Sequence, residues 1–396
     1  MAKNRGQRPG KKPLKVRVDF RKNREKTARD KARWTRQHRD DSIEHQDAEK
    51  TESVRAKGTV SRKRTIVLRD ESTGDQILCS GVVVRMRGLI AEVDDGGQRW
   101  ACTVRGILRT RRIKERHPVT VGDRVRFSPV EIAGEQSRQI SEEQALPAGI
   151  VERVEARKTA LLRQYDRRLQ VVAANVDIAL IVVAVRQPTL RPHLIDRYLV
   201  AAHQGDMRPV ICINKIDLDA ESLSKPIAGR YREIGYVVLE TSVVDRLGLN
   251  ALRRLLRDQT SVLVGASGVG KSSLLNALDP KLSLRVGTMT DLQRGRHTTT
   301  TTSLLRWAFG GYVVDTPGMR QFDPATIKAT ELEAYFAEFV DLIPQCRFPD
   351  CSHTHEQDCA IKAAVAAGDI SQQRYDSYCK MYAECKQKEQ AEHVSD

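Results

Sequence analysis

The stretch that decides the fold reads Gly265-Ala266-Ser267-Gly268-Val269-Gly270-Lys271-Ser272. It matches the phosphate-binding loop pattern in full, and it lies between an apolar strand, residues 261–264, and a helical stretch, residues 273–278. Glycines let backbone N–H groups converge on phosphate oxygens, and the helix N-terminus adds its positive dipole. Lys271 would then reach the β- and γ-phosphates, and the Ser272 hydroxyl would bind Mg²⁺.

A second motif, Asn214-Lys215-Ile216-Asp217, follows the apolar run 209–213. The Asp217 carboxylate only accepts hydrogen bonds, which suits the two donors on the Watson–Crick edge of guanine. Adenine presents an acceptor there, so the motif predicts GTP rather than ATP. Asn214 is expected to steady the loop and the base, and the stem of Lys215 to lie over the ring. Thr241-Ser242, after another strand, is expected to supply backbone contacts to the base.

The order of the two motifs is unusual. In ordinary guanine-nucleotide switches the phosphate loop opens the domain and the base-recognition motif comes late, whereas here the base-recognition motif comes first. The sequence therefore predicts a circularly permuted GTPase. Permutation joins the usual termini and opens new ends elsewhere, so segments fused at the new ends could respond to the nucleotide state.

Two further segments complete the predicted nucleotide site. Asp315-Thr316-Pro317-Gly318 follows a strand, so Asp315 is expected to hold Mg²⁺ and the Gly318 amide to sense the γ-phosphate. The segment 294–300 occupies the position of a switch loop, and either Thr299 or Thr300 should complete the Mg²⁺ shell with Ser272. The predicted GTP-binding residues are Asn214, Lys215, Ile216, Asp217, Gly265, Ala266, Ser267, Gly268, Val269, Gly270, Lys271, Ser272, Ser273, Asp315 and Gly318.

The predicted catalytic residue is His297. Ras-like enzymes have a glutamine after the glycine of Asp-x-x-Gly to orient the attacking water, but here that residue is Met319, which cannot do so. His297, in the predicted switch loop, is the side chain able to orient or accept a proton from water. The alternative is that His297 contacts RNA or is simply solvated.

A metal site is predicted near the C-terminus. Cys346, Cys351, His353 and Cys359 offer three thiols and one imidazole within fourteen residues, which is typical of a closed structural site for one Zn²⁺. His355 is the rival to His353. Cys379 and Cys385 are expected to pack in a helix or to be free thiols.

The chain divides into four predicted regions. Residues 160–325 alternate apolar strands (176–185, 209–213, 236–239, 261–264) with helices around 195–204 and 247–256, and end in a hairpin, 304–314, as in a doubly wound α/β GTPase domain. Residues 76–150 show short strands over 81–85, 89–93, 99–104 and 121–127, with a turn at 94–97, typical of an OB-type barrel. Residues 326–388 are predicted to be a helical zinc-binding domain.

The fourth region is a basic arm. Residues 1–64 carry 22 Lys/Arg against 9 Asp/Glu, a net charge of +13 out of +16 for the chain. With almost no aliphatic periodicity, residues 1–65 are predicted to be disordered and to bind nucleic acid; a solubilising tail, a membrane surface and an Arg-rich transit peptide are the alternatives. More basic residues cluster in the predicted barrel: Arg85, Arg87, Arg105, Arg109, Arg111, Arg112, Lys114 and Arg116.

Cellular context follows from cysteine usage and hydropathy. Eight cysteines in apolar strands or at metal-ligand spacing suit a reducing compartment. No apolar run reaches about 18 residues, so we expect a cytoplasmic protein with no membrane partner, and a monomer.

Taken together, these motifs resemble the circularly permuted ribosome-assembly GTPases of the YjeQ/RsgA family. Ala174-Asn175-Val176-Asp177 and Ile195-Asp196-Arg197-Tyr198 add to the resemblance, which covers residues 76–385. It implies late action on the small ribosomal subunit, with barrel and zinc domain gripping rRNA, stimulated GTP hydrolysis and release, and catalysis by His297. The alternatives are a nucleotide-gated RNA chaperone with incidental hydrolysis, and a zinc-linked ATPase or kinase.

Overall fold

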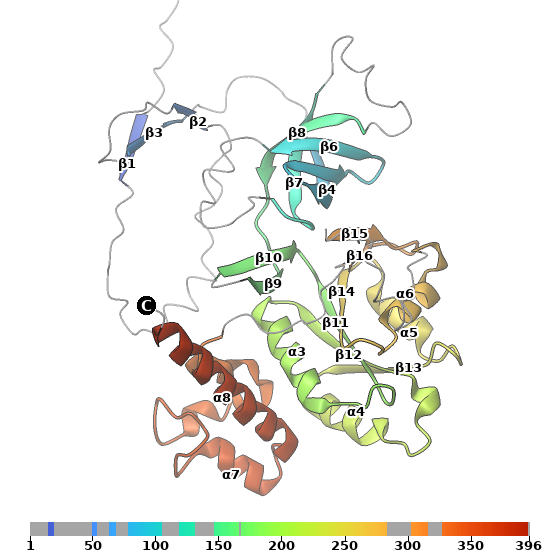
Figure 1. Cartoon of the computed structure of the whole chain (residues 1–396), viewed down its shortest axis with the longest axis vertical. Helices are drawn as coiled ribbons and strands as arrows, with labels where there is room; N and C mark the ends of the chain where they lie inside the picture. Colours follow the sequence, from blue (N-terminus) through green and yellow to red (C-terminus); the bar gives the residue numbers. More distant parts are fainter. Residues whose placement is uncertain are drawn as a thin grey trace, which may run out of the picture. The chain divides into compact units, whose positions relative to one another are not determined.

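The computed structural model describes residues 15–19, 50–53, 63–68, 78–104, 119–130, 146–165, 168–282, 302–315 and 327–394 (Figure 1). Near the N-terminus, β1 (Lys15–Asp19), β2 (Lys50–Ser53) and β3 (Lys63–Leu68) pair antiparallel in the order β1-β3-β2. The expectation of disorder over 1–65 does not hold for these strands. Their sequences explain the difference, because β1 alternates valine with charged residues and β3 contains Ile66-Val67-Leu68.

Five strands form a small closed barrel, with the order β4-β5-β6-β8-β7 and an additional β4–β7 pairing. They are β4 (Cys79–Arg87), β5 (Ile90–Asp94), β6 (Arg99–Val104), β7 (Arg124–Pro129) and β8 (Ala148–Val154). Buried barrel side chains include Val83, Val93, Cys102, Phe127 and Val151. The first four strands were predicted, whereas β8 was missed because its apolar run stops at Glu152. Of the basic cluster, Arg85 and Arg87 lie on β4, and Arg105, Arg109, Arg111, Arg112, Lys114 and Arg116 lie outside the described residues.

The strands that carry the nucleotide motifs continue the same hydrogen-bonded sheet, through an antiparallel pairing of β4 with β15 (Ser303–Arg306) at Arg85 and Ser303. Besides β15, these strands are β11 (Ile178–Ala184), β12 (Arg208–Asn214), β13 (Val237–Thr241), β14 (Thr260–Val264) and β16 (Tyr312–Asp315). They run in the order β13-β12-β11-β14-β16-β15, and only β15 is antiparallel to its neighbour. The predicted strands and the terminal hairpin are confirmed. An additional hairpin, β9 (Ala160–Tyr165) with β10 (Arg168–Ala174), was not predicted.

Helices cover both faces of this part of the sheet (Figure 1). β11 is buried along its whole length, and its residues alternate between two cores. Ala179, Ile181 and Val183 pack with α3 (Pro192–Gln204) and α4 (Ser224–Glu233). Ile178, Leu180 and Val182 pack with α5 (Leu249–Leu256) and α6 (Lys271–Leu278). This two-sided burial explains why the strand has a continuous apolar sequence instead of an alternating one.

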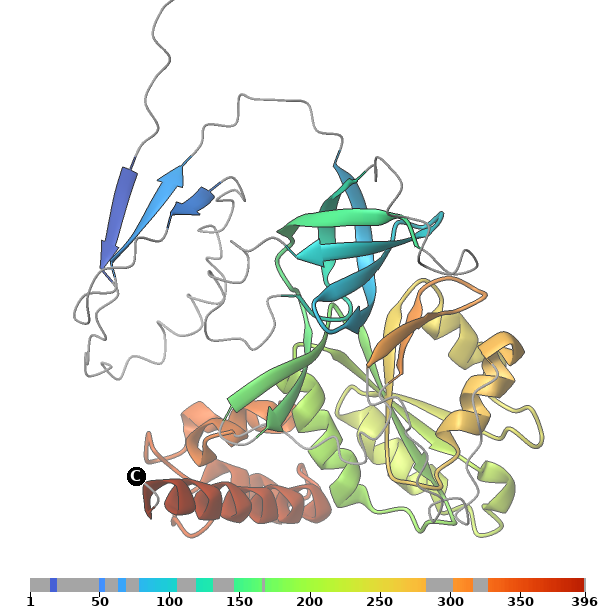
Figure 2. The same ribbon diagram turned by 45° about the horizontal axis from the view of Figure 1, so that its top comes forward.

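The C-terminal segment begins with short 3-10 helices, labelled η, and ends in α-helices (Figure 2). In order they are η5 (Ala329–Tyr335), η6 (Ala337–Phe339), η7 (Ile343–Gln345), α7 (Ala360–Ala367) and α8 (Gln372–Val394). Phe336, Phe339 and Tyr378 form the centre of its core. Among the described residues, no helix combines the length and apolar character needed to cross a membrane.

The C-terminal segment is joined to the nucleotide-binding domain by a buried ionic network. The Arg374 guanidinium on α8 donates to Asp196 on α3 at 2.7 Å and to both carboxylate oxygens of Glu338 at 2.6 and 2.9 Å. Tyr231 on α4 donates a further hydrogen bond to Asp196 at 2.7 Å, and Arg374 stacks on the Phe336 ring. Asp196 belongs to the Ile195-Asp196-Arg197-Tyr198 stretch noted in the sequence. Its hydrogen bond from Arg374 links α3 to the C-terminal segment.

Candidate nucleotide site and metal centre

The nucleotide motifs meet at one edge of the sheet. β12 ends at Asn214, β13 at Thr241, β14 at Val264 and β16 at Asp315, and these four strands run parallel with β11. The carboxyl ends of parallel strands are where open α/β sheets bind their ligands. The sheet therefore assembles motifs that are a hundred residues apart in the sequence.

The phosphate loop has the backbone that its glycines predict. Gly265, Gly268 and Gly270 all have positive φ, and α6 begins at Lys271. A Cβ at Gly265 would lie 2.1 Å from the carbonyl oxygen of Val182. Only glycine can occupy this position, because the loop crosses directly over β11.

Lys271 is held inside the loop. Its Nζ donates to the carbonyl oxygens of Gly265 at 2.7 Å and Ala266 at 2.8 Å. Burial lowers the pKa of this ammonium group from its ordinary value. The side chain thus lies along the phosphate loop, where its ammonium N–H groups can donate to phosphate oxygens of a bound nucleotide.

Asn214 ties the base-recognition motif to the phosphate loop. Its amide Nδ2 donates to the carbonyl oxygen of Val269 at 2.9 Å, and its Oδ1 accepts from the Thr241 hydroxyl at 3.0 Å. The side chain is only 2% exposed. These contacts suit the loop-steadying role expected of Asn214, with Thr241 as an additional side-chain partner, and its role toward the base stays a prediction.

Lys215 and Asp217 each have a supporting contact. Lys215 adopts a left-handed backbone conformation, and its Nζ donates to the carbonyl oxygen of Gln187 at 2.6 Å. The Ser242 hydroxyl donates to Oδ1 of Asp217 at 2.7 Å and accepts from the Asp245 N–H at 3.0 Å. Ser242 thus orients the Asp217 carboxylate through its side chain, while the backbone contact expected of Thr241-Ser242 stays a prediction.

Of the predicted Mg²⁺ ligands, Ser272 and Asp315 lie in the described part of the chain. Asp315 is half-buried at the end of β16; burial raises the pKa of its carboxyl, and the charge of Arg85 opposes that rise. Ser272 and Ser273 lie in the first turn of α6. The remaining predicted residues, His297, Thr299, Thr300, Gly318 and the neighbouring Met319, lie outside the described residues.

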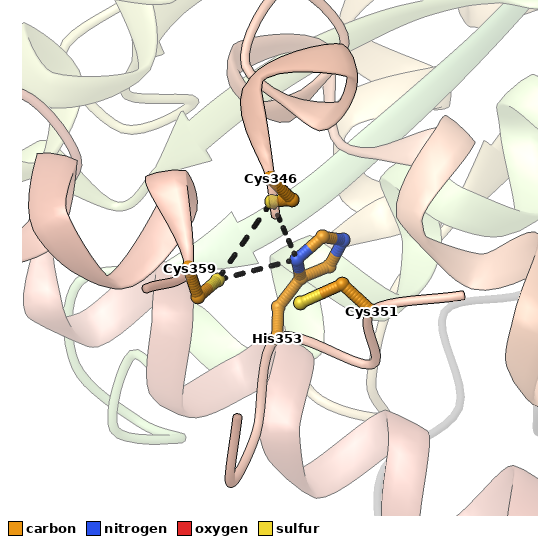
Figure 3. Close-up of side chains that lie close together, drawn as sticks. All are labelled: Cys346, Cys351, His353 and Cys359. Carbon is orange, nitrogen blue, oxygen red and sulfur yellow. Dashed lines mark hydrogen bonds between the residues drawn. The ribbon is translucent and has the colours of Figure 1, made fainter. Parts of the chain in front are cut away.

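The four predicted zinc ligands converge (Figure 3). Their ligand atoms all lie within 4.8 Å of one another. His353 Nδ1 is 3.5 Å from Cys346 Sγ and 3.4 Å from Cys359 Sγ, and these two sulfurs are 4.0 Å apart. His355, the rival ligand, has a side chain that is 84% exposed and is not part of the cluster.

The donor set and its dimensions fit Zn²⁺. Tetrahedral bonds of about 2.3 Å to sulfur and 2.0–2.1 Å to nitrogen imply S···S separations near ~3.8 Å and N···S separations near ~3.5 Å. Those lengths agree with the contacts around His353 Nδ1. Three thiols and one imidazole fill a tetrahedron, which is the pattern of a structural site. Cys379 and Cys385 lie on α8, outside this group.

Two supporting residues, Gln187 and Glu333, were not predicted from the sequence, and a third, Thr241, was predicted in a different role. Gln187 binds Lys215 through a carbonyl oxygen, Thr241 supports Asn214 through its hydroxyl, and Glu333 lies 2.8 Å from Nε2 of His353. Gln187 and Glu333 belong to no local pattern. Thr241 drew attention because it lies at the end of a strand. Its hydrogen bond to the buried Asn214 amide could not be predicted, because it depends on β13 pairing with β12.

Comparisons with known proteins agree with this geometry. A sequence profile of the RsgA GTPase family matches residues 154–325. The small ribosomal subunit biogenesis GTPase RsgA of Thermotoga petrophila is 39% identical over 310 residues, covering 77% of this chain and 96% of that relative. The RsgA protein of Chlorobaculum tepidum is 38% identical, covering 76% of this chain and 96% of that protein.

Solved structures give the same result. The crystal structure of YjeQ from Thermotoga maritima matches with a TM-score of 0.62 and 35% identity, over 78% of this chain and 99% of that chain. YloQ, described as a circularly permuted GTPase, matches with a TM-score of 0.60 and 31% identity, over 81% of this chain and 99% of that chain. This chain is therefore a GTPase and belongs to the RsgA family of circularly permuted GTPases.

Proposed function

We propose that this GTPase acts in late maturation of the small ribosomal subunit, binding rRNA and leaving the subunit after GTP hydrolysis. The observation that carries the proposal is the similarity to curated RsgA proteins, which extends over 77% of the chain. Those relatives are named for small-subunit biogenesis. The junction of the phosphate loop with the base-recognition motif, through Asn214 and Val269, supports the GTPase part of the assignment.

In this proposal the guanine base is read by Asp217, which Ser242 orients. Lys271 gives up its hydrogen bonds to the loop carbonyls and binds the β- and γ-phosphates instead. The backbone N–H groups of residues 265–273 surround the phosphate oxygens. Ser272, Asp315 and either Thr299 or Thr300 would hold Mg²⁺. When bound, Mg²⁺ neutralises charge on the β- and γ-phosphate oxygens. The Gly318 amide would report the presence of the γ-phosphate.

Hydrolysis requires a group that orients water in line with the γ-phosphate. Met319 cannot do this, so we assign the role to His297, whose neutral imidazole can accept a hydrogen bond from water. In the described part of the chain, η5 of the C-terminal segment is the next element after β16, which ends at Asp315. We therefore expect a change in segment 315–318 on hydrolysis to be transmitted to residues 327–394.

Charge suggests how RNA contact is divided. Residues 1–64 carry a net +13, whereas residues 327–394 carry 7 Lys/Arg against 12 Asp/Glu, a net −5. Phosphate binding depends on cationic side chains. We therefore assign rRNA phosphate contacts to the arm and the basic barrel residues, and expect the C-terminal segment to contribute little electrostatic affinity.

The finer layout belongs to the same proposal: an OB-type barrel over 76–150, a permuted GTPase domain over 160–325 and a zinc-binding domain over 326–388. Cys346, Cys351, His353 and Cys359 would hold one structural Zn²⁺. Beyond the small ribosomal subunit, we expect no membrane partner, a monomeric protein and a cytoplasmic location.

GTP turnover with and without isolated small ribosomal subunits tests the function. The wild-type chain should be strongly stimulated by small subunits, and His297→Ala should lose the stimulation. His355→Ala is the matched control, since His355 is exposed and lies outside both sites. An unchanged wild-type rate on adding subunits would contradict the proposed partner. Normal subunit assembly in cells carrying a turnover-deficient His297→Ala protein would favour the RNA-chaperone alternative.

A further inference from the structure

Glu333 is a half-buried carboxylate that the nucleotide mechanism does not use. Its Oε2 lies 2.8 Å from Nε2 of His353, the ring nitrogen that faces away from the sulfurs. The Glu333 side chain is 15% exposed and that of His353 is 0% exposed. A short contact between two side chains so well shielded from water is a specific pairing, because an unpaired carboxylate in this position would be costly.

The pairing settles which ring nitrogen is free to bind metal. A neutral imidazole carries a proton on one nitrogen and a lone pair on the other. With Nε2–H donated to Glu333, the lone pair is on Nδ1, 3.5 Å from Cys346 Sγ and 3.4 Å from Cys359 Sγ. Carboxylates that hold the far N–H of a ligating histidine fix its tautomer and ring orientation and increase its basicity.

Glu333 comes from a different part of the chain than the four ligands. They lie between residues 346 and 359, whereas Glu333 is on η5, the first element after Asp315 that the structure describes. η5 packs against α3 and α8, and its Ala329 N–H donates to the Glu389 carboxylate on α8 at 2.8 Å. One hydrogen bond therefore connects the metal centre to the element that follows the GTPase sheet.

We propose that Glu333 is a positioning residue for the metal centre, which holds His353 in the metal-binding tautomer and links metal occupancy to the position of η5. The inference rests on the proposed zinc site. Glu333 is then a fifth residue of the metal centre, which acts on the metal indirectly by holding the His353 ring. Because η5 is the first described element after β16, bound zinc would then steady the segment that follows the GTPase sheet.

Zinc affinity of the full-length chain is the first test, measured by competition with a chromophoric chelator. Glu333→Gln should lower the affinity for Zn²⁺ by about 10- to 100-fold, because an amide is a weaker acceptor and can also present N–H groups to the ring. Glu331→Gln is the matched control: it lies on the same turn, is 45% exposed and pairs with Lys328. Its zinc affinity should equal that of the wild type.

The second readout is amide hydrogen exchange of residues 329–335. In the wild type, Zn²⁺ should slow exchange there, and in Glu333→Gln this zinc dependence should disappear while GDP binding is unchanged. If Glu333→Gln fails to fold, Glu333→Asp gives the same test, with an affinity between those of wild type and a chain lacking the carboxylate. Wild-type affinity and zinc-dependent exchange in a folded Glu333→Gln protein would overturn the proposal. A wild-type chain that binds neither Zn²⁺ nor Co²⁺ would instead refute the zinc site itself.

Discussion

The nucleotide edge and the metal centre of this molecule are built in opposite ways. The metal ligands come from one short segment, residues 346–359, and their reactive atoms face one another. The nucleotide residues come from the ends of several strands between 214 and 315, and their contacts, such as Lys271 to its loop carbonyls, are ones a ligand can replace. With zinc bound, the Cys/His cluster would therefore stabilise the fold, whereas the contacts at the nucleotide edge suit the binding and release of a ligand.

This contrast has energetic consequences. Closing a short loop with a metal costs little chain entropy, and the binding free energy becomes folding free energy. At the nucleotide edge the folding energy comes instead from the two apolar cores on either side of β11. Substitutions among the nucleotide residues should therefore reduce binding or turnover and leave folding intact, while substitutions around the metal centre and its attachment should do the reverse.

The largest expected effect is at Asp217. Asp217→Asn replaces a two-fold acceptor for guanine with an amide, and the loss of two charged hydrogen bonds should weaken GTP binding by about 10²- to 10⁴-fold. Xanthine nucleotides should bind better than GTP, since the amide can donate to the 2-oxo group and accept from N1–H. Competition against fluorescent GDP measures both. Asp245→Asn, which also contacts Ser242, should keep wild-type specificity. Displacement of GDP by ATP from the wild type would favour the ATPase alternative.

Lys271→Ala should lower GTP turnover by about 10²- to 10³-fold, the usual loss when one preorganised donor to the reacting group is removed. The melting temperature should stay close to that of the wild type, because within the described residues the ammonium group hydrogen-bonds to carbonyl oxygens of its own loop. Lys281→Ala, an exposed lysine just beyond α6, removes the same charge and should leave turnover unchanged. Equal turnover in the two variants would mean that the phosphate loop is not the hydrolytic site.

Arg374→Met should act on stability alone. It leaves Asp196 and Glu338 buried without their cation, so the free energy of unfolding should fall by about 3–5 kcal/mol. Arg347→Met breaks an exposed ion pair with Asp358 and should cost about 0–1 kcal/mol. Urea unfolding followed by circular dichroism compares the two variants, and GDP affinity of the folded proteins should be equal. Identical unfolding curves would show that the buried network does not attach the C-terminal segment.

Local patterns allowed much of this structure to be predicted. The continuously apolar strands, the glycine positions of the phosphate loop and the Cys/His spacing each reflect a requirement that is met within a few residues. Other features depend on which elements become neighbours. Glu333 lies 20 residues from His353, and Arg374 lies 178 residues from Asp196. Such pairs carry no local signal, because each side chain alone resembles an ordinary solvated charge until packing removes it from water.

Co-sedimentation with small ribosomal subunits tests the central claim most directly. The chain should pellet with small subunits in the presence of a non-hydrolysable GTP analogue and should be released when GTP is supplied and hydrolysed. Lys271→Ala should prevent the GTP-dependent release, and large subunits should not retain the chain in any nucleotide state. Equal retention with the analogue, with GTP and with GDP, or equal binding to large subunits, would contradict a nucleotide-controlled role on the small subunit.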